Sequence, residues 1–102
     1  MTSMADRLRV TILGCGASGG VPRADGGWGV CDPADPRNRR TRCGVLLQGG
    51  RHEHTPGSPA TTILIDTPPE LRQQLVQANP GRLDAVVFSH EHADQTHGLD
   101  DV

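Results

Sequence analysis

Residues 61–90, TTILIDTPPELRQQLVQANPGRLDAVVFSH, decide the order of elements in this chain. Two apolar, β-branched runs, 61–67 and 83–90, predict buried strands. Between them a proline pair introduces a segment, 70–79, that predicts a helix, and the Asn-Pro-Gly sequence at 79–81 ends it. A strand, a helix and a second strand in this order predict a parallel crossover and therefore an α/β fold.

The first half of the chain adds two more predicted strands and a long loop. Residues 7–13 and 43–48 have the apolar pattern of strands, and the segment 14–42 between them is punctuated by glycine and proline. Segment 49–60 consists of turn-forming residues and predicts an exposed hairpin connection. The chain therefore predicts one domain, residues 1–102, with a long loop after its first strand.

Composition narrows the class of protein. The 102 residues include 10 basic side chains, all arginine, and 12 acidic ones, for a net charge of −2. This near balance is not typical of a nucleic-acid-binding protein. No apolar run approaches the roughly 20 residues of a membrane-spanning helix, and no export signal is apparent. Three cysteines without a CxxC pair are typical of free, buried thiols in a reducing compartment, so we expect a cytoplasmic protein.

A glycine motif follows the first predicted strand. Gly14, Gly16 and Gly19 form the pattern G-x-G-x-x-G, which in dinucleotide-binding proteins opens a helix that holds a pyrophosphate. Here a proline-punctuated loop follows Gly20 and leaves no room for that helix. We favour a glycine turn that lets the strand end pass close to another segment, and a dinucleotide-binding module remains the weaker alternative.

The segment richest in reactive side chains is 89–101, SHEHADQTHGLDD, directly after the last predicted strand. Imidazole and carboxylate groups are ligands that zinc prefers, and a catalytic zinc ion has about three protein ligands and a water. A turn after a strand end allows His90 and His92 to converge on one ion, while Asp94 faces a second ion or the attacking water. The segment predicts a metal site, with a solvated polar turn as the alternative.

The pattern H-x-H-x-D resembles the metal signature of the metallo-β-lactamase-fold hydrolases. Several separated blocks are similar to the branch of that family that includes the phosphoribosyl cyclic phosphodiesterases: LGCGASGGVPR (13–23), WGVCDP (28–33), PRNRRTRC (36–43), ILIDTPPELRQQL (63–75) and HADQTHGLDDV (92–102). The resemblance implies the N-terminal half of a four-layer αββα metallo-β-lactamase sandwich, because the family's remaining ligands come from a second half. We therefore expect an N-terminal fragment, whose final residues GLDDV (98–102) look like the start of a helix.

The resemblance also implies roles for individual residues. His90 and His92 would ligate the first metal, and Asp94 would ligate the second and act in catalysis. Gln95 stands where the family commonly has a histidine ligand. Either His97 takes that place as a ligand, or the enzyme works with one metal.

The implied cofactor is zinc, one or two ions, with manganese as an alternative. Such a metal lowers the pKa of bound water to about 7 and so supplies a hydroxide. Asp66, at the end of a strand, would orient a ligating histidine by a hydrogen bond, or it would only cap the turn that follows. A positively charged site favours a small phosphodiester as substrate over a neutral amide, and a homodimer is compatible with the sequence.

Three questions stay open at this level. Arginines of the long loop either hold a substrate phosphate or form a solvated loop face: Arg23, Arg37, Arg39, Arg40 and Arg42. His52 and His54 also form an H-x-H pattern, but in a turn, where we expect exposed bystanders. Finally, the chain is either part of a complete hydrolase, or a non-catalytic metal-binding remnant or a half-domain that a partner completes.

Overall fold

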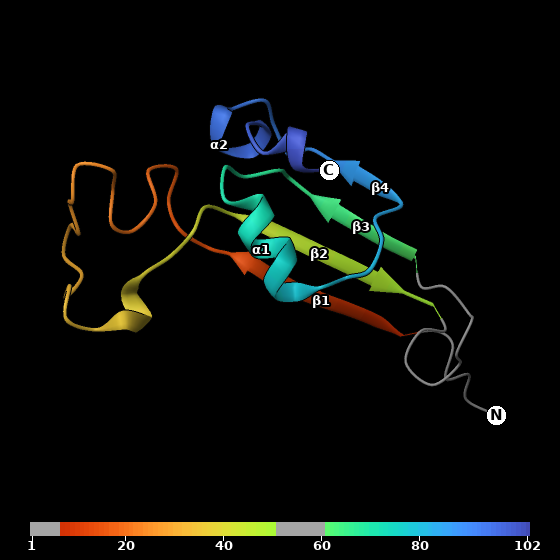
Figure 1. The fold of residues 1–102 in the computed structure, drawn as a ribbon, viewed down its shortest axis with the longest axis horizontal. Coiled ribbons are helices and arrows are strands. Elements are labelled where there is room, and N and C mark those ends of the chain that lie inside the picture. The colour runs from red at the N-terminus through yellow and green to blue at the C-terminus, as the bar shows by residue number, and fades with distance from the viewer. Residues whose placement is uncertain (1–6, 51–60) are drawn as a thin grey trace.

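The chain folds around one mixed β-sheet with a helix on one of its faces (Figure 1). The computed structural model describes residues 7–50 and 61–102. In chain order the elements are β1 (Leu8–Gly14), β2 (Gly44–Gly49), β3 (Thr61–Ile65), α1 (Leu71–Ala78), β4 (Ala85–Val87) and α2 (Ala93–Thr96). Short 3₁₀ helices cover Pro36–Asn38 and Leu99–Asp101. The sheet order is β1-β2-β3-β4, antiparallel through the first three strands and parallel between β3 and β4.

The predicted crossover is present as β3, α1 and β4. Leu64 of β3 lies opposite Val86 of β4 in the parallel pair. The helix ends at Asn79, whose left-handed backbone (φ 50°) lets its N–H donate to the carbonyl of Leu75. Proline at position 80 cannot continue the helix. The α/β class is therefore confirmed.

β4 is shorter than the strand predicted at 83–90. At its start, the N–H of Thr62 donates to the Asp84 carboxylate (2.7 Å) and not to a strand carbonyl. Beyond its end, the N–H of Ser89 donates to Asp66 Oδ1 (2.7 Å). Side chains thus replace the backbone ladder at both ends, and periodicity alone does not reveal such replacements.

The first three strands agree with their predicted positions. β1 pairs antiparallel with β2, and β2 with β3, as a hairpin requires. Most of the predicted hairpin connection, with His52 and His54, lies outside the described residues.

The glycines after β1 serve a close approach between two segments. A Cβ on Gly14 would lie 2.5 Å from Thr41 Oγ1 and 2.6 Å from Gln74 Nε2, and the N–H of Gly16 donates to the carbonyl of Thr41 (2.7 Å). Within residues 7–50 the only helix is the three-residue turn at Pro36–Asn38. The glycine turn is therefore confirmed, and the dinucleotide-binding alternative lacks the helix on which it depends.

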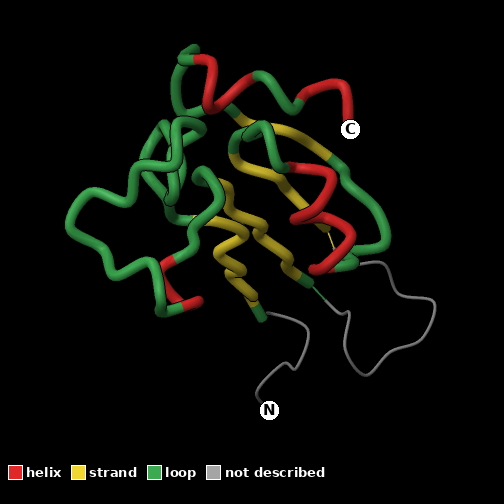
Figure 2. The backbone as a smooth tube through the Cα atoms, turned by 60° about the vertical axis from the view of Figure 1, so that its left-hand side comes forward, coloured by secondary structure: helices red, strands yellow, loops and turns green. Residues whose placement is uncertain are grey.

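The core lies between the sheet and α1 (Figure 2). Leu46 of β2, Leu64 of β3 and Leu71 of α1 are almost completely buried, with relative exposures of 1%, 0% and 0%. Partly buried apolar side chains surround them: Leu13, Leu75, Ala78, Leu83 and Val86.

The opposite face of the sheet is apolar as well, but exposed. Leu8, Val10 and Ile12 of β1 have relative exposures of 69%, 55% and 60%. The register places Val10 beside Leu47, and directly paired residues share a face of the sheet. A sheet with a helix on one face and an apolar second face has the character of one half of a layered sandwich.

Two predictions from composition concern the cysteines and the membrane. Cys15, Cys31 and Cys43 are free in the structure. Cys15 and Cys43 are exposed and Cys31 is half-buried, so the expectation that all three are buried is wrong. All three lie between the end of β1 and the start of β2, in the segment that projects from the sheet (Figure 1). Among the helices of residues 7–50 and 61–102, none combines the length and apolar character that crossing a membrane needs.

Candidate functional site

Asp66 and the first residues of the predicted metal segment lie where β3 and β4 end. Because these strands are parallel, their carboxyl ends meet at one edge of the sheet. Asp66 follows β3 directly, and Ser89 to His92 follow β4. The structure therefore brings Asp66 and the histidine segment to one edge of the sheet, and their function stays a prediction.

Asp66 is a buried carboxylate in a constrained backbone position. Its side chain is 7% exposed, and its φ of 67° is uncommon for a residue with a Cβ. Its N–H donates to the carbonyl of Val87 (2.9 Å). Its two carboxylate oxygens accept from Ser89: Oδ1 from the backbone N–H and Oδ2 from the hydroxyl, both at 2.7 Å. Asp66 thus fixes the start of the histidine segment.

Ser89 connects Asp66 to His90. Its Oγ lies 3.0 Å from His90 Nδ1. A hydroxyl has one proton, and here that proton goes to the Asp66 carboxylate, so the ring must donate its Nδ1–H to Ser89. In a neutral imidazole this leaves the lone pair on Nε2, the form that binds a metal through that nitrogen.

The hydrogen bond from Asp66 therefore reaches a histidine indirectly. The sequence predicts a direct bond, whereas the structure inserts the Ser89 hydroxyl. Ser89 stands immediately before the first histidine of H-x-H-x-D, and this position is the sequence signal that could have indicated its link to His90.

His90 and His92 lie together. Their rings meet edge to face, with centroids 4.6 Å apart and an interplanar angle of 77°. Both residues are exposed. His92 also begins α2, where its carbonyl accepts from the N–H of Gln95 (2.9 Å). The site therefore contains two adjacent, accessible imidazoles.

The segment after the histidines is attached to the β3–α1 connection. The N–H and hydroxyl of Thr67 both donate to the carbonyl of Gln95, at 2.7 Å and 3.0 Å. The N–H of Gly98 donates back to the carbonyl of Thr67 (2.8 Å). These bonds hold α2 at the same edge of the sheet as Asp66.

Asp94 and Gln95 interact with each other. Gln95 Nε2 donates to Asp94 Oδ2 (2.7 Å). The Gln95 side chain is 6% exposed, and its Oε1 is buried without a hydrogen-bond partner. Since the carboxylate can only accept, this contact fixes which end of the amide faces Asp94.

The four predicted ligands His90, His92, Asp94 and His97 do not form one cluster. Among the described residues, no group of three or more His, Cys, Asp and Glu side chains gathers to hold a metal ion. Asp94 is engaged by Gln95, and His97 is an exposed residue at the end of α2. The donor set that the structure brings together is two imidazoles, which suit zinc but do not complete its coordination.

Comparison with solved structures places this arrangement in a known fold. The chain is similar to a structure described as a new diphosphatase from the PhnP family, with 40% identity and a TM-score of 0.75, over 94% of this chain and 34% of that one. It is also similar to Zn²⁺-bound PqqB from Methylobacterium extorquens, with 27% identity and a TM-score of 0.59, over 91% of this chain and 35% of that one.

Curated relatives also match short parts of their own length. An octanoyltransferase of Porphyromonas gingivalis is 38% identical over 97 residues, which are 93% of this chain and 18% of that protein. Coenzyme PQQ synthesis protein B of Rhodopseudomonas palustris is 39% identical over 71 residues, 68% of this chain and 20% of that protein. The chain thus spans about a fifth of the curated relatives and about a third of the solved structures.

A family model covers the site itself. Residues 61–102, from β3 to the last residue, match the Beta-lactamase superfamily domain. Together with the four-stranded sheet and the structural neighbours, this match confirms the resemblance that the H-x-H-x-D pattern indicates. The chain has the fold of one part of a metallo-β-lactamase-superfamily domain.

Proposed function

We propose that this chain is the metal-binding part of a hydrolase that cleaves phosphodiester or diphosphate bonds. The superfamily match and the diphosphatase among its structural neighbours support the reaction class. The observation that carries the proposal is the hydrogen-bonded chain from Asp66 through Ser89 to His90.

That chain prepares His90 to ligate a metal. The buried carboxylate orders the Ser89 hydroxyl, and the hydroxyl holds the imidazole with its proton on Nδ1. In the neutral ring the Nε2 lone pair then faces away from Ser89 and is available to a metal. Partners of this kind orient metal-ligating histidines and raise their basicity.

His92 would supply the second imidazole. Its ring already lies 4.6 Å from that of His90, measured between centroids. Asp94, which follows in α2, would take part in binding a second ion or in orienting the attacking water. Zinc is the cation that this donor set suits best, and a PqqB structure similar to this chain is described as Zn²⁺-bound. When bound, the metal supplies an activated water and neutralises charge on the attacked phosphate.

A second candidate is a non-catalytic metal-binding unit. The observation in its favour is that, across residues 7–50 and 61–102, no group of three or more potential ligands gathers. Hydrolysis of an activated phosphodiester, such as bis(4-nitrophenyl) phosphate, distinguishes this candidate from the enzyme.

The deciding experiment is His92→Ala in the protein as its own cell produces it. We expect both bound metal, measured by plasma mass spectrometry, and phosphodiester hydrolysis to be lost. Glu91→Ala is the matched control, because Glu91 is an exposed residue between the two histidines and is expected to keep both properties. Full metal content in His92→Ala would reject the proposed ligand pair.

Ser89→Ala tests the hydrogen-bonded chain separately. Loss of such a supporting partner lowers metal affinity by about 10- to 100-fold. Nitrogen NMR of the metal-free protein should show His90 shifting from the Nδ1–H form toward a mixture of tautomers. An unchanged tautomer in Ser89→Ala would show that the serine does not position this ring.

A further inference from the structure

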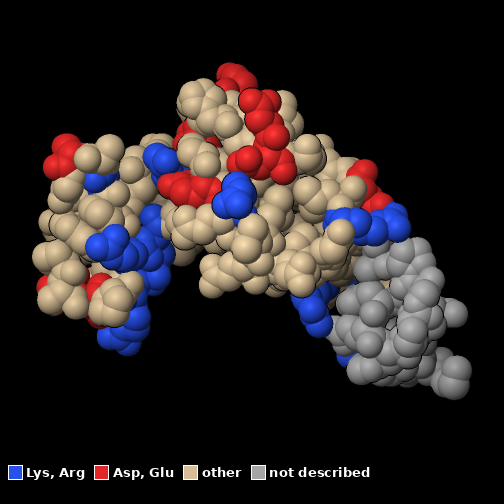
Figure 3. Space-filling model, viewed as in Figure 1, with Lys and Arg blue, Asp and Glu red and all other residues tan. Residues whose placement is uncertain are grey.

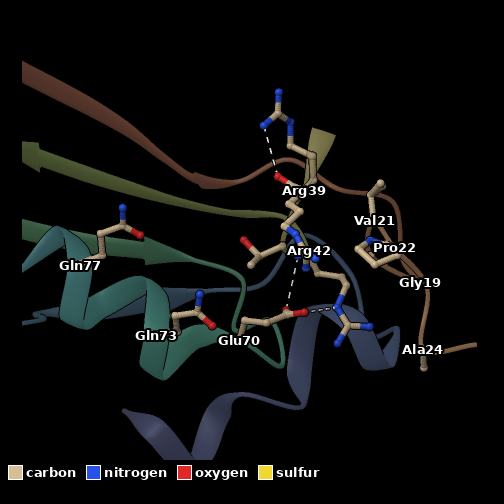
Figure 4. Close-up of a pocket in the computed structure, with 12 residues that line it drawn as sticks. Gly19, Val21, Pro22, Ala24, Arg39, Arg42, Glu70, Gln73 and Gln77 are labelled. Atoms are coloured by element: carbon tan, nitrogen blue, oxygen red, sulfur yellow. Dashed lines mark hydrogen bonds and ion pairs between the residues drawn. The ribbon is translucent and has the colours of Figure 1, made fainter. Parts of the chain in front are cut away.

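A pocket separates the long loop from α1 (Figure 4). Its volume is about 660 Å³, within the range of about 300–1,000 Å³ that is typical of small-molecule sites. One wall is formed by residues 19–22 and 39–42 of the loop, and the other by Glu70 and the amide side chains of Gln73 and Gln77.

The loop wall is held in place by backbone and side-chain hydrogen bonds. Val21 and Arg40 exchange two backbone bonds, at 3.0 Å and 2.9 Å. Gln74, a buried residue of α1, donates from Nε2 to Thr41 Oγ1 (2.9 Å) and to the carbonyl of Arg42 (3.0 Å). The pocket is therefore formed before any ligand arrives.

Arg42 and Glu70 balance each other's charge at the helix side of the pocket. Arg42 Nε lies 2.7 Å from Glu70 Oε1, and the two side chains are 25% and 23% exposed. The N–H of Arg42 also donates to Glu70 Oε2 (3.4 Å). Figure 4 shows the Arg42 guanidinium turned toward the Glu70 carboxylate, with a dashed line that marks their contact.

Arg39 and Arg40 line the same pocket without such a partner. Among the described residues, neither forms an ion pair with a carboxylate. The guanidinium of Arg39 lies 5.3 Å from the centre of the Trp28 ring, and Arg40 Nη1 donates only to the carbonyl of Arg39 (3.3 Å).

Other arginines of the loop are neutralised. Arg37 pairs with Asp35 at 2.9 Å, and Arg23 lies 3.5 Å from Asp25. The pKa of Asp35 is lowered chiefly by its hydrogen bonds with Arg37, and least by the charge of Arg40. Figure 3 shows the basic side chains of this loop in blue, gathered on the left of the molecule. The structure thus separates five arginines that the sequence leaves equivalent, and among the described residues it leaves Arg39 and Arg40 without a paired carboxylate.

We infer that this pocket binds a phosphate-type oxyanion of a small molecule through the guanidinium groups of Arg39 and Arg40. A guanidinium presents planar donors that match phosphate oxygens in pairs. The one carboxylate in the pocket, Glu70, is already engaged by Arg42, so it does not repel an incoming anion at full strength. Gln73 and Gln77 offer amide groups to the polar remainder of the ligand.

The inference rests on the proposed function for the class of ligand, a phosphate, but neither arginine belongs to the proposed metal ligands. The experiment is therefore made on metal-free protein, produced whole and treated with EDTA. Inorganic pyrophosphate is titrated into it at low salt, and binding is measured by calorimetry. Because the protein in this titration holds no metal, the result does not depend on whether His92 is a metal ligand.

Arg40→Gln is the main variant, and it keeps the backbone bonds that Arg40 makes to Val21. Loss of one charged hydrogen-bonding group should raise the Kd for pyrophosphate by about tenfold. Arg39→Gln should have a similar effect, and it serves as the second variant if circular dichroism shows that Arg40→Gln is unfolded.

Arg72→Gln is the matched control. Arg72 is exposed on α1 and does not line the pocket, so this variant loses the same charge and should change the Kd by less than about twofold. If Arg72→Gln and Arg40→Gln lost the same affinity for pyrophosphate, the binding would be due to general electrostatic attraction and not to this pocket. That result, or the absence of pyrophosphate binding to the wild-type protein at millimolar concentration, would overturn the inference.

Discussion

The packing of Gly98 against the β3–α1 connection provides a sharp test of how the site is held together. A Cβ on Gly98 would overlap the carbonyl oxygen of Pro68 and lie 2.9 Å from Leu71 Cβ. Both Pro68 and Leu71 are fully buried. Gly98 has φ −88° and ψ 6°, a conformation open to alanine, so Gly98→Ala tests packing and not backbone preference.

Two separate estimates of the destabilisation caused by Gly98→Ala agree. If the backbone stays in place, overpacking costs about 1–3 kcal/mol. If the segment moves away, it loses three hydrogen bonds between Thr67 and the α2 segment, each worth about 1 kcal/mol. We therefore expect Gly98→Ala to lower the free energy of unfolding by about 2–3 kcal/mol.

Urea unfolding followed by circular dichroism measures this difference. Gly49→Ala is the control, since a Cβ there would meet its nearest atoms at ordinary contact distances of 3.7 Å and 3.9 Å. Its stability should stay within about 0.5 kcal/mol of the wild-type value. If Gly98→Ala were as stable as Gly49→Ala, the close contact with Pro68 would not exist, and the attachment of α2 would need another explanation.

Two further predictions concern acid stability and metal content. The pKa of Asp84 is lowered from its ordinary value of 3.8 chiefly by the hydrogen bond from Arg82, so its stabilising contribution is present above that pH and is lost as the pH falls through the folded-state pKa. Asp84→Asn should therefore flatten the decline in stability measured by urea unfolding below about pH 4, and an unchanged decline would contradict the assignment. Gln95→His should raise the number of metal ions bound per chain, because imidazole is a stronger ligand than a neutral amide; unchanged content by plasma mass spectrometry would mean that His97 or another group already fills that place.

Local signals were sufficient to predict most of the fold. The strands and the crossover follow from apolar periodicity, and Asn79-Pro80-Gly81 ends the helix through backbone preferences that a sequence displays directly. The prediction for β4 was too long because Asp84 and Asp66 take the hydrogen bonds at its two ends. These side-chain contacts join residues more than 20 positions apart, and no local pattern indicates them.

The sequence indicated which residues are candidates for the site, but it did not indicate how their side chains are arranged. The clustering of His90 and His92 follows from their spacing at a strand end, and the structure brings their rings together. The link through Ser89 required knowledge of where its single hydroxyl proton goes. The charge pattern of the pocket depended on ion pairs such as Arg42 with Glu70, which are 28 positions apart, so arginines that look alike in the sequence differ in the fold.

Gln95 is held at the edge of the sheet by both its backbone and its side chain. Its carbonyl fixes α2 to Thr67, and its Nε2 is committed to Asp94. Its Oε1 is then left buried without a donor among the described residues, and an unpaired buried acceptor costs about 1–3 kcal/mol. Rotating the amide would not relieve this cost, because it would bring Oε1 against the Asp94 carboxylate, which can only accept. The Gln95 side chain is therefore held in one orientation by its hydrogen bond to Asp94, while the lack of a donor for Oε1 among the described residues offsets part of the stabilisation that this bond and the bonds to Thr67 contribute.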